Sequence, residues 1–314
     1  MAAALKKGQK ISQFRIVEIL PEGSGGMANV VKAQHITNGN VLALKVCRSS
    51  DFGNFSVNAL KAEVEILRRL NHPGIVKILP IESEIGKQVF MERATEITGA
   101  PWFFAMEYLA GASVGDLLKR VKTLTEGETG AIIFHVVRAL DYIHNQGYSH
   151  NDIKMNNVLF RNPLEKNGGF EPVLIDFGIT RKKERIQQDA GSLQYMAPEQ
   201  LAEMRQERAP ELVLDGAKVD VYAIGVLMYR MLAQKLPLNG ISEVGITTAI
   251  MTKTPVEPNQ INSRISPQIN ELIMACLSKR PETRPTNKQI LLALHQYADC
   301  HFTSYQSGGL FRKS

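Results

Sequence analysis

The chain has 314 residues, 44% of them hydrophobic and 22% charged, an ordinary composition for a soluble globular protein long enough for two lobes. Its net charge of +6 is too mild for nucleic-acid binding to be the expected main role. The longest apolar stretch, residues 219–233, contains Arg230 and is too short to span a membrane, so it predicts a buried helix. Cys47, Cys276 and Cys300 lie far apart without metal-binding spacing, which predicts neither disulfides nor zinc and favours a reducing, cytoplasmic setting.

The first third of the chain has the pattern of a β-rich lobe. Alternating apolar and polar residues predict strands at 13–20, 28–36 and 41–47. An Asn-Gly pair at 38–39 predicts a hairpin between the last two strands. The one helix expected in this region covers residues 59–72, where apolar residues recur at helical spacing.

The rest of the chain has mostly helical patterns. Residues 131–147 carry an apolar stripe at helical spacing, and Gly147 provides a stop signal at the end. Two short apolar segments, 158–160 and 173–175, can pair as an antiparallel hairpin. A small β-rich lobe followed by a larger helical lobe gives an α+β fold, with the join near residues 107–111.

Glycines cluster between the first two predicted strands, in "GSGGMANVV". Gly23, Gly25 and Gly26 allow backbone amides to approach a ligand closely, and phosphate oxygens are the ligand that such loops often bind. The glycines alone leave a plain turn open as the alternative. Their place between strands, without a GK[ST] sequence, argues against a dinucleotide fold or a Walker loop.

A lysine and a glutamate of the β-rich region are expected to pair. Strand alternation places Lys45 on the same face as Ala43. In the helix that follows, Glu63 lies at the edge of the buried stripe, whereas Glu65 lies on the outer face. Because a buried carboxylate needs a cationic partner, Lys45 is the natural partner for Glu63.

Polar residues crowd into "HNDIKMNN", residues 150–157, between two segments that are predicted to be buried. Pairing of the two short strands would bring Asn157 and Asp176 together, and their oxygens are ligands suited to Mg²⁺. Asp152 could then accept a proton or orient a hydroxyl, and Lys154 could neutralise charge on a transferring phosphate. The run therefore predicts a catalytic loop for phosphoryl transfer.

These motifs follow one another in the order found in the protein-kinase family, which the chain resembles over residues 12–295. The family's glycine loop, strand lysine and helix glutamate match "GSGGMANV", Lys45 and Glu63. Its catalytic loop, DFG and APE motifs match "HNDIKMNN", "DFG" and "APE". Lys154, two residues after the catalytic acid, is the serine/threonine-kinase pattern, and the glycine loop looks most like that of bacterial-type members.

The resemblance implies the two-lobed protein-kinase fold, with a small β-rich N-lobe that has one helix and a larger, mainly helical C-lobe. It divides the chain into an N-terminal tail (1–11), an N-lobe (12–106), a hinge (107–111), a C-lobe (112–298) and a C-terminal tail (299–314). The end of the chain, "HFTSYQSGGLFRKS", is polar and contains glycines, so we expect it to be flexible. The resemblance also implies that Arg284 pairs with Glu199.

The resemblance assigns a function, an ATP-dependent transfer of phosphoryl groups to Ser or Thr hydroxyls of protein substrates, with Mg²⁺ as cofactor. Asp152 would be the catalytic base, assisted by Lys154, Lys45 and Glu63. Asn157 and Asp176 would hold the metal. The residues expected to bind the nucleotide are Gly23, Ser24, Gly25, Gly26, Val30, Ala43, Lys45, Met106, Glu107, Leu109, Asn157 and Asp176. Among these, Met106 would be the gatekeeper, and the backbones of Glu107 and Leu109 would meet adenine.

The chain departs from the family pattern in several places. Ala28 stands where the loop has its third glycine, and Asn151 replaces the arginine of the HRD motif. Three connections are longer than usual, at 82–101, 161–172 and 200–218. The last is expected near the substrate, where it could shape recognition or be a tolerated surface insertion.

The segment after the DFG motif has an unusual composition. Residues 181–191, "RKKERIQQDAG", contain no Ser, Thr or Tyr, and the nearest hydroxyls belong to Thr180 and Ser192. Asn151 also lacks the charge with which the family's arginine binds a phosphate on this segment. Both absences predict a kinase whose activation loop is ordered without phosphorylation.

Two other functions fit parts of the sequence. A pseudokinase would bind nucleotide as a scaffold, but such proteins generally lose one of the four positions held here by Lys45, Asp152, Asn157 and Asp176. A small-molecule phosphotransferase of the aminoglycoside-kinase type would share the catalytic acid and the ATP-binding lobe. Against it stand "GSLQYMAPE" and "RPETRP", which belong to peptide docking. The sequence gives no indication of an oligomeric state.

Overall fold

A computed structural model describes residues 5–20, 28–48, 55–83, 86–121, 123–177, 193–204 and 214–303 of the chain. The chain divides into two compact units. The first is Met1–Leu109 with Phe177–Ile179, and the second is Ala110–Asp176 with Thr180–Ser314. None of the helices in the described ranges is long and apolar enough to cross a membrane.

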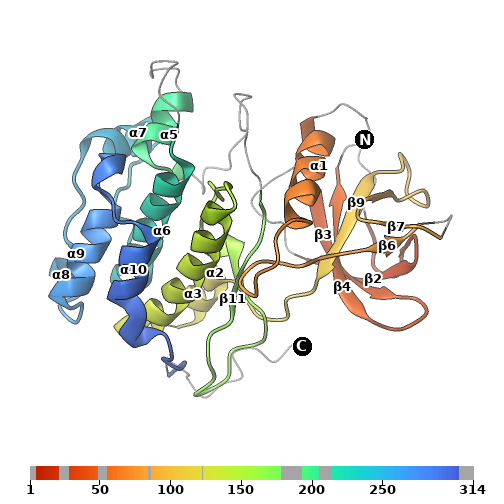
Figure 1. Cartoon of the computed structure of the whole chain (residues 1–314), viewed down its shortest axis with the longest axis horizontal. Helices are drawn as coiled ribbons and strands as arrows, with labels where there is room; N and C mark the ends of the chain where they lie inside the picture. The colour runs from red at the N-terminus through yellow and green to blue at the C-terminus, as the bar shows by residue number, and fades with distance from the viewer. Residues whose placement is uncertain are drawn as a thin grey trace. The chain divides into compact units, whose positions relative to one another are not determined.

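The first unit is built on an antiparallel sheet, with strands in the order β1-β2-β3-β4-β9-β5 and β8 paired to β9 (Figure 1). Its strands are β1 (Lys10–Ile11), β2 (Phe14–Ile19), β3 (Ala28–His35), β4 (Val41–Cys47), β5 (Ile78–Leu79), β8 (Glu92–Arg93) and β9 (Trp102–Glu107). The predicted hairpin across the Asn-Gly turn is confirmed, because β3 and β4 pair antiparallel with Val30 opposite Lys45. An apolar core made by alternate residues of these strands holds the sheet together.

Helix α1 (Phe55–Leu67) is the helix of this unit, and it packs against β4 (Figure 1). It begins four residues earlier and ends five residues earlier than the predicted range of 59–72. Leu60, Val64 and Leu67 are buried, as the apolar stripe predicts. The early end has a local cause: Pro73 cannot continue a helix, and the Asn-His pair before it favours a turn.

Two parts of the first unit are more ordered than the sequence suggests. The expected tail at 1–11 already contains β1, whose Ile11 lies opposite Phe14 and is fully buried. The long connection at 82–101 adds the small hairpin of β6 (Ile81–Glu82) and β7 (Gln88–Val89), and then β8. β1 and β8 extend the main sheet by pairing with β2 and β9, whereas β6 and β7 pair with each other in a separate two-stranded sheet.

The second unit is mainly helical. Its larger elements are α2 (Val114–Arg120), α3 (Glu126–Asn145), α5 (Pro198–Met204), α6 (Gly216–Ala233), α7 (Glu243–Thr252), α8 (Pro258–Ile261), α9 (Pro267–Cys276) and α10 (Asn287–Leu294). The predicted buried helix is α6, which is apolar on nearly all sides and is covered by α3, α8 and α9. Helix α10 packs against α3.

A two-stranded hairpin, β10 (Val158–Phe160) and β11 (Pro172–Leu174), lies beside α3. Its antiparallel pairing is as predicted, with Val158 opposite Leu174, although β11 begins and ends one residue before the expected strand. Pro172 is tolerated because it occupies the first position of the strand, where its missing N–H is least harmful. The short 3₁₀ turn η1 (Met155–Asn157) leads directly into β10.

The expected flexible tail, residues 301–314, lies outside the described residues except for 301–303. After α10 and the 3₁₀ turn η3 (His295–Tyr297), the described chain continues to residue 303, and Phe302 is fully buried. The start of the expected tail is therefore held on the unit by this aromatic side chain.

Candidate active site

The predicted ion pair of the first unit is present. Lys45 Nζ lies 2.8 Å from Glu63 Oε1 and 2.7 Å from Oε2, and both side chains are largely buried. Strand β4 carries Lys45 and helix α1 carries Glu63, so the pair joins the helix to the sheet. The ammonium is thereby held at one place on the sheet.

Other predicted nucleotide contacts of this unit lie on neighbouring strands. Val30 is opposite Lys45 on β3, and Met106 is opposite Ala43 on β9. Gly23, Ser24, Gly25 and Gly26 lie outside the described residues.

The segment that leaves β9 is held by backbone hydrogen bonds. Glu107 N donates to Lys77 O at 2.9 Å, and Lys77 N donates back to Glu107 Oε1 at 2.9 Å. Leu109, which ends the unit, is buried. The stretch from Met106 to Leu109 is therefore fixed from the side of β5.

In the second unit, the catalytic loop is anchored to α6 through one buried carboxylate. Asp220 is fully buried and accepts hydrogen bonds from the backbone amides of His150 (2.8 Å) and Asn151 (2.7 Å). His144 Nε2 lies 2.8 Å from the same side chain. A buried carboxylate satisfied by three donors is a rigid support for the loop backbone.

The partners of the two histidines determine which ring nitrogen carries the proton. His150 Nε2 lies 3.0 Å from the carbonyl oxygen of Ile175, so it must donate there. His144 Nε2 donates to Asp220, and its Nδ1 accepts from Asn287 Nδ2 at 2.8 Å. Both rings are therefore oriented from two sides, and His150 ties the catalytic loop to the residue before Asp176.

Two side chains donate to the carboxylate of the predicted catalytic acid, Asp152: Lys154, predicted to be catalytic, and Asn157, predicted to bind the metal. Lys154 Nζ donates to Asp152 Oδ2 at 2.9 Å. Asn157 Nδ2 donates to the same oxygen at 2.9 Å and to the backbone oxygen of Asp152 at 2.8 Å. Lys154 and Asn157 are buried, whereas the Asp152 side chain is 38% exposed. Since both donors bind Oδ2, Oδ1 is the oxygen of Asp152 that can receive a proton from outside.

The two predicted metal ligands are adjacent, as the hairpin requires. Ile175 N donates to Asn157 O at 3.0 Å, so Asp176 directly follows a residue bonded to Asn157. Because its amide nitrogen is engaged by Asp152, Asn157 presents Oδ1 as an acceptor. A carboxamide oxygen beside a carboxylate fits Mg²⁺, which takes few protein ligands and fills its shell with phosphate and water. Within the described ranges there is no cluster of three His, Cys, Asp or Glu side chains that would suit a metal held by protein alone.

Two residues of this site have the left-handed backbone conformation that few side chains adopt. Asp176 has φ of 58° and Asn151 has φ of 60°. Asn and Asp tolerate this region better than other residues. An asparagine at position 151, where the family has arginine, therefore suits the left-handed backbone conformation.

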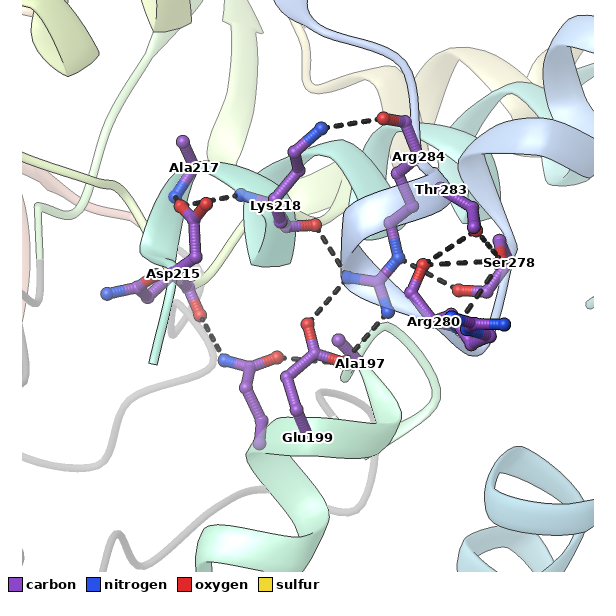
Figure 2. A network of polar contacts seen from close by, with 11 residues as sticks. Ala197, Glu199, Asp215, Ala217, Lys218, Ser278, Arg280, Thr283 and Arg284 are labelled. Carbon is purple, nitrogen blue, oxygen red and sulfur yellow. Dashed lines mark hydrogen bonds and ion pairs between the residues drawn. The ribbon is translucent and has the colours of Figure 1, made fainter. Parts of the chain in front are cut away.

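A second buried ion pair of the second unit joins α5 to the segment before α10. Arg284 binds Glu199 through both nitrogens of its fork, Nη1–Oε1 at 2.5 Å and Nη2–Oε2 at 2.8 Å (Figure 2). Its remaining donors reach Ser278 O and Lys218 O, each at 2.8 Å. Its guanidinium also stacks over the ring of Tyr222. The expected pair is confirmed, and each of the three guanidinium nitrogens of this clamp has at least one acceptor.

Comparison with known proteins identifies the family. The family model described as "Protein kinase domain" matches residues 16–297. The chain belongs to the protein kinase family. Its two units are the β-rich and helical lobes of the kinase fold, and a crystal structure of Rad53 residues 1–466 with AMP-PNP superposes on it with a TM-score of 0.68. That match has 26% sequence identity and covers 91% of this chain and 65% of the Rad53 chain.

The similar curated kinases come from distant organisms. Serine/threonine-protein kinase pkn3 of Myxococcus xanthus is 30% identical over 91% of this chain and 50% of its own length. Sperm motility kinase 3A of Mus musculus is 28% identical, with coverages of 90% and 49%. CBL-interacting serine/threonine-protein kinase 20 of Arabidopsis thaliana is also 28% identical, with coverages of 86% and 55%. This kinase chain thus spans about half the length of the curated relatives it matches.

Sequence reasoning missed part of the support beneath the kinase site. His144 and Asn287 were not singled out, although each is a polar residue beside an apolar stripe, which is a signal for a buried hydrogen bond. Tyr195 was also missed. Burial raises its pKa, with a backbone hydrogen bond to Met155 acting in the opposite direction. Tyr195 therefore stays a neutral phenol next to the catalytic loop.

Proposed function

We propose that the chain is an ATP- and Mg²⁺-dependent serine/threonine protein kinase. The observation that carries this proposal is the convergence of Lys154 and Asn157 on Oδ2 of Asp152, with Asp176 next to Asn157. This arrangement supplies a base, a cation and two metal-ligand oxygens within one rigid hairpin and loop. The serine/threonine specificity rests on Lys154, two residues after the acid, and on the names of the similar kinases.

Asp152 acts on the acceptor hydroxyl of the protein substrate. Its Oδ1 accepts the hydroxyl proton while the hydroxyl oxygen forms a bond to the γ-phosphorus and the bond from that phosphorus to the β-phosphate oxygen breaks, which releases ADP. Lys154 donates to Asp152 and offsets negative charge on the transferring group. Asn157 holds the Asp152 side chain in place through its amide nitrogen.

The nucleotide roles follow the same proposal. Lys45, held by Glu63, would contact the α- and β-phosphates. Asn157 and Asp176 would hold Mg²⁺, which would neutralise negative charge on the phosphate oxygens. Met106 acts as gatekeeper. Adenine is bound by the backbones of Glu107 and Leu109, next to Val30 and Ala43, and the phosphates by Gly23, Ser24, Gly25 and Gly26.

We also propose residues 107–111 as the hinge between lobes at 12–106 and 112–298. Support comes from the end of β9 at Glu107 and the end of the first unit at Leu109. A reducing, cytoplasmic setting remains our proposal, and it rests on the wide separation of the three cysteines in the sequence.

The decisive experiment compares Asp152→Asn with wild type. Purified protein is incubated with ATP, Mg²⁺ and dephosphorylated casein, and phosphate transfer is measured together with nucleotide affinity. We expect turnover to fall by about 10²–10⁴-fold with nucleotide affinity unchanged, because a general base acts only on the reacting hydroxyl. The matched control is Asp141→Asn, which changes a partly exposed carboxylate on α3 and should keep wild-type turnover.

Other outcomes of the same assay would select the alternatives. Nucleotide binding without transfer by the wild-type chain would indicate a pseudokinase. Transfer to an aminoglycoside such as kanamycin, without transfer to casein, would indicate a small-molecule phosphotransferase. Wild-type turnover by Asp152→Asn would show that the site is wrongly assigned.

We further propose that the activation loop is ordered without phosphorylation. The loop residues 181–191, with Thr180 and Ser192, lie outside the described residues, so the support comes from the segment that follows the loop and from the catalytic loop. Gln200 Nε2 donates to Asn151 O at 3.3 Å, and Ala197 N donates to Gln200 Oε1 at 2.9 Å. Gln200 thus ties the catalytic loop to the APE segment without a phosphate.

The test uses protein treated with phosphatase and shown by mass spectrometry to carry no phosphate on residues 176–199. It should phosphorylate casein at its full rate from the first seconds. A lag that disappears after preincubation with ATP, together with phosphate on Thr180 or Ser192, would contradict this proposal.

A further inference from the structure

The end of the described chain is bound into the second unit by an aromatic side chain. Phe302 is fully buried, although its neighbours His301 and Thr303 are exposed. Its backbone pairs in both directions with the long connection between β10 and β11. Asn167 N donates to Phe302 O at 2.9 Å, and Phe302 N donates to Gly168 O at 2.9 Å. We call residues 301–303 the C-terminal strap.

The ring of Phe302 continues a line of aromatic contacts toward the catalytic hairpin. It packs edge-on against Phe170 with ring centroids 5.9 Å apart, and Phe170 packs against Phe160 at 6.1 Å. Phe160 is the last residue of β10 and is fully buried. These contacts fill the space between the strap and the hairpin, so removal of the Phe302 ring would leave Phe170 unsupported.

The strap also donates hydrogen bonds to a buried carboxylate. Glu128 Oε1 accepts from Thr303 N at 2.7 Å and from Thr303 Oγ1 at 3.0 Å. Glu128 Oε2 accepts from Thr125 N and Oγ1, which form the N-terminal cap of α3. Because Glu128 is only 1% exposed, loss of the two bonds from Thr303 would remove two donors from a buried carboxylate, which is costly.

The hairpin that receives these contacts carries the proposed metal ligands. Asn157 immediately precedes β10, and its carbonyl accepts from Ile175 N, next to Asp176. Phe160 N is itself bonded to Ala112 O at 3.0 Å. A shift of Phe160 would therefore move the strand that sets the position of Asn157.

We propose that Phe302 is a positioning residue, which acts through Phe170 and Phe160 to hold the β10–β11 hairpin in the geometry needed for phosphoryl transfer. Thr303 secures the strap by its bonds to Glu128. The kinetic consequence rests on the proposed kinase function, whereas the structural consequence does not. The connection at 161–172, expected only to be longer than usual, then provides the binding surface for the strap.

The test combines kinetics with amide hydrogen exchange on Phe302→Ala. We expect kcat to fall about tenfold or more with KM for ATP unchanged, since small displacements of metal ligands affect the transition state more than binding. The amides of Phe160 and Ile175 should exchange faster than in wild type, while amides inside α6 do not change. His301→Ala, an adjacent exposed side chain, is the control and should behave as wild type.

Further variants keep the proposal open to refutation. Phe302→Leu should recover most of the lost turnover, because it restores apolar volume beneath Phe170. If Phe302→Ala does not fold, Thr303→Val, which keeps the ring and the backbone N–H, should show smaller changes of the same kind. Wild-type kcat and wild-type exchange in these variants would overturn the proposal. A wild-type chain without kinase activity would refute the proposed function, while the exchange data would still decide whether the strap holds the hairpin.

Discussion

Among the residues that the structure describes, each unit of the kinase has a buried ion pair between a basic residue and a glutamate, Lys45–Glu63 and Arg284–Glu199, and the two pairs are built differently. In the first unit, Lys45 meets Glu63 through a single ammonium at 2.7 and 2.8 Å. In the second unit, Arg284 meets Glu199 through both nitrogens of its fork and also donates to two backbone carbonyls. The Arg284 side chain is 0% exposed, compared with 14% for Lys45.

The difference separates a functional pair from a structural one. Arg284 makes four hydrogen bonds in fixed directions and stacks on Tyr222, and its own carbonyl accepts from Lys218 Nζ at 2.6 Å (Figure 2). Such a planar fork suits a permanent joint. An ammonium is a compact charge with rotatable donors, which can interact with a carboxylate and a phosphate together. We therefore expect changes at Lys45 to affect turnover and changes at Arg284 to affect stability.

The largest effect is expected for Lys45→Met. Turnover on casein should fall at least about 100-fold, because the charge that binds the phosphates is removed. Stability should also decrease, since Glu63 is left buried without its cation. The measurements are kcat from initial rates and the midpoint of urea unfolding. Lys61→Met, on the exposed face of α1, is the matched control and should keep both wild-type values.

The double variant Lys45→Met with Glu63→Gln separates the effect of the unpaired Glu63 charge from the effect of losing the Lys45 charge. Removal of the glutamate charge should recover most of the lost stability, because no unpaired buried ion remains. Turnover should stay as low as in the single variant. Recovery of turnover along with stability would mean that Lys45 is a structural residue like Arg284.

The next largest effect is expected for Arg284→Lys, which keeps the positive charge but loses the guanidinium that binds Glu199 through two nitrogens. The free energy of unfolding should fall by about 3 kcal/mol, because the buried Glu199 loses a bidentate partner and two carbonyls lose their donors. The kcat of the protein that remains folded should stay near that of wild type. Urea unfolding and rates corrected for the folded fraction measure the two quantities.

The matched control for Arg284→Lys is Arg280→Lys. Arg280 pairs with Glu282 at 2.8 Å, but the two side chains are 75% and 61% exposed. Exposed pairs contribute little, so stability should change by less than about 0.5 kcal/mol. A large decrease in the free energy of unfolding for Arg280→Lys, or no decrease for Arg284→Lys, would mean that the bidentate Arg284–Glu199 pair is not the source of the stability.

The sequence predicted the site better than its support. Lys45 and Glu63 could be paired from the strand and helix patterns because burial of a carboxylate imposes a cation. The hairpin before Asp176 was predictable to within one residue, since two short apolar strands of similar length can pair in few ways. The bonds of His144 and Asn287 could not be predicted, because they join residues 143 positions apart.

The strap shows a different limit. Composition made 301–314 look flexible, and the connection at 161–172 looked only longer than usual. Phe170 is the one aromatic residue of that connection, whereas 301–314 contains Phe302, Tyr305 and Phe311, and only the fold brings Phe302 and Phe170 together. An aromatic residue in a polar insertion, with others in a polar tail, is the signal that could have suggested such a contact.

The smallest expected effect on stability comes from Lys279, which lies near the Arg284–Glu199 clamp. Its Nζ is buried and has no hydrogen-bond partner among the residues that the structure describes. Burial first, and the charge of Arg284 second, lower the pKa of Lys279 to about 8, from 10.5. The folded protein thus binds this proton less tightly than the unfolded chain does. Stability of the wild type should therefore rise with pH between about 8 and 10.5, and the full penalty should apply below about 8.

The substitution Lys279→Met removes the titratable amine, and with it the free-energy cost of burying a charged ammonium. The variant should be more stable than wild type at about pH 7, by less than about 1 kcal/mol because the residue is only half-buried, and this gain should shrink toward pH 10. Urea unfolding at both pH values measures the gain, with Lys288→Met on the exposed side of α10 as the control. An equal gain at both pH values would show that apolar packing and not the charge is responsible. A loss of stability would mean that the ammonium has a favourable role beside the clamp.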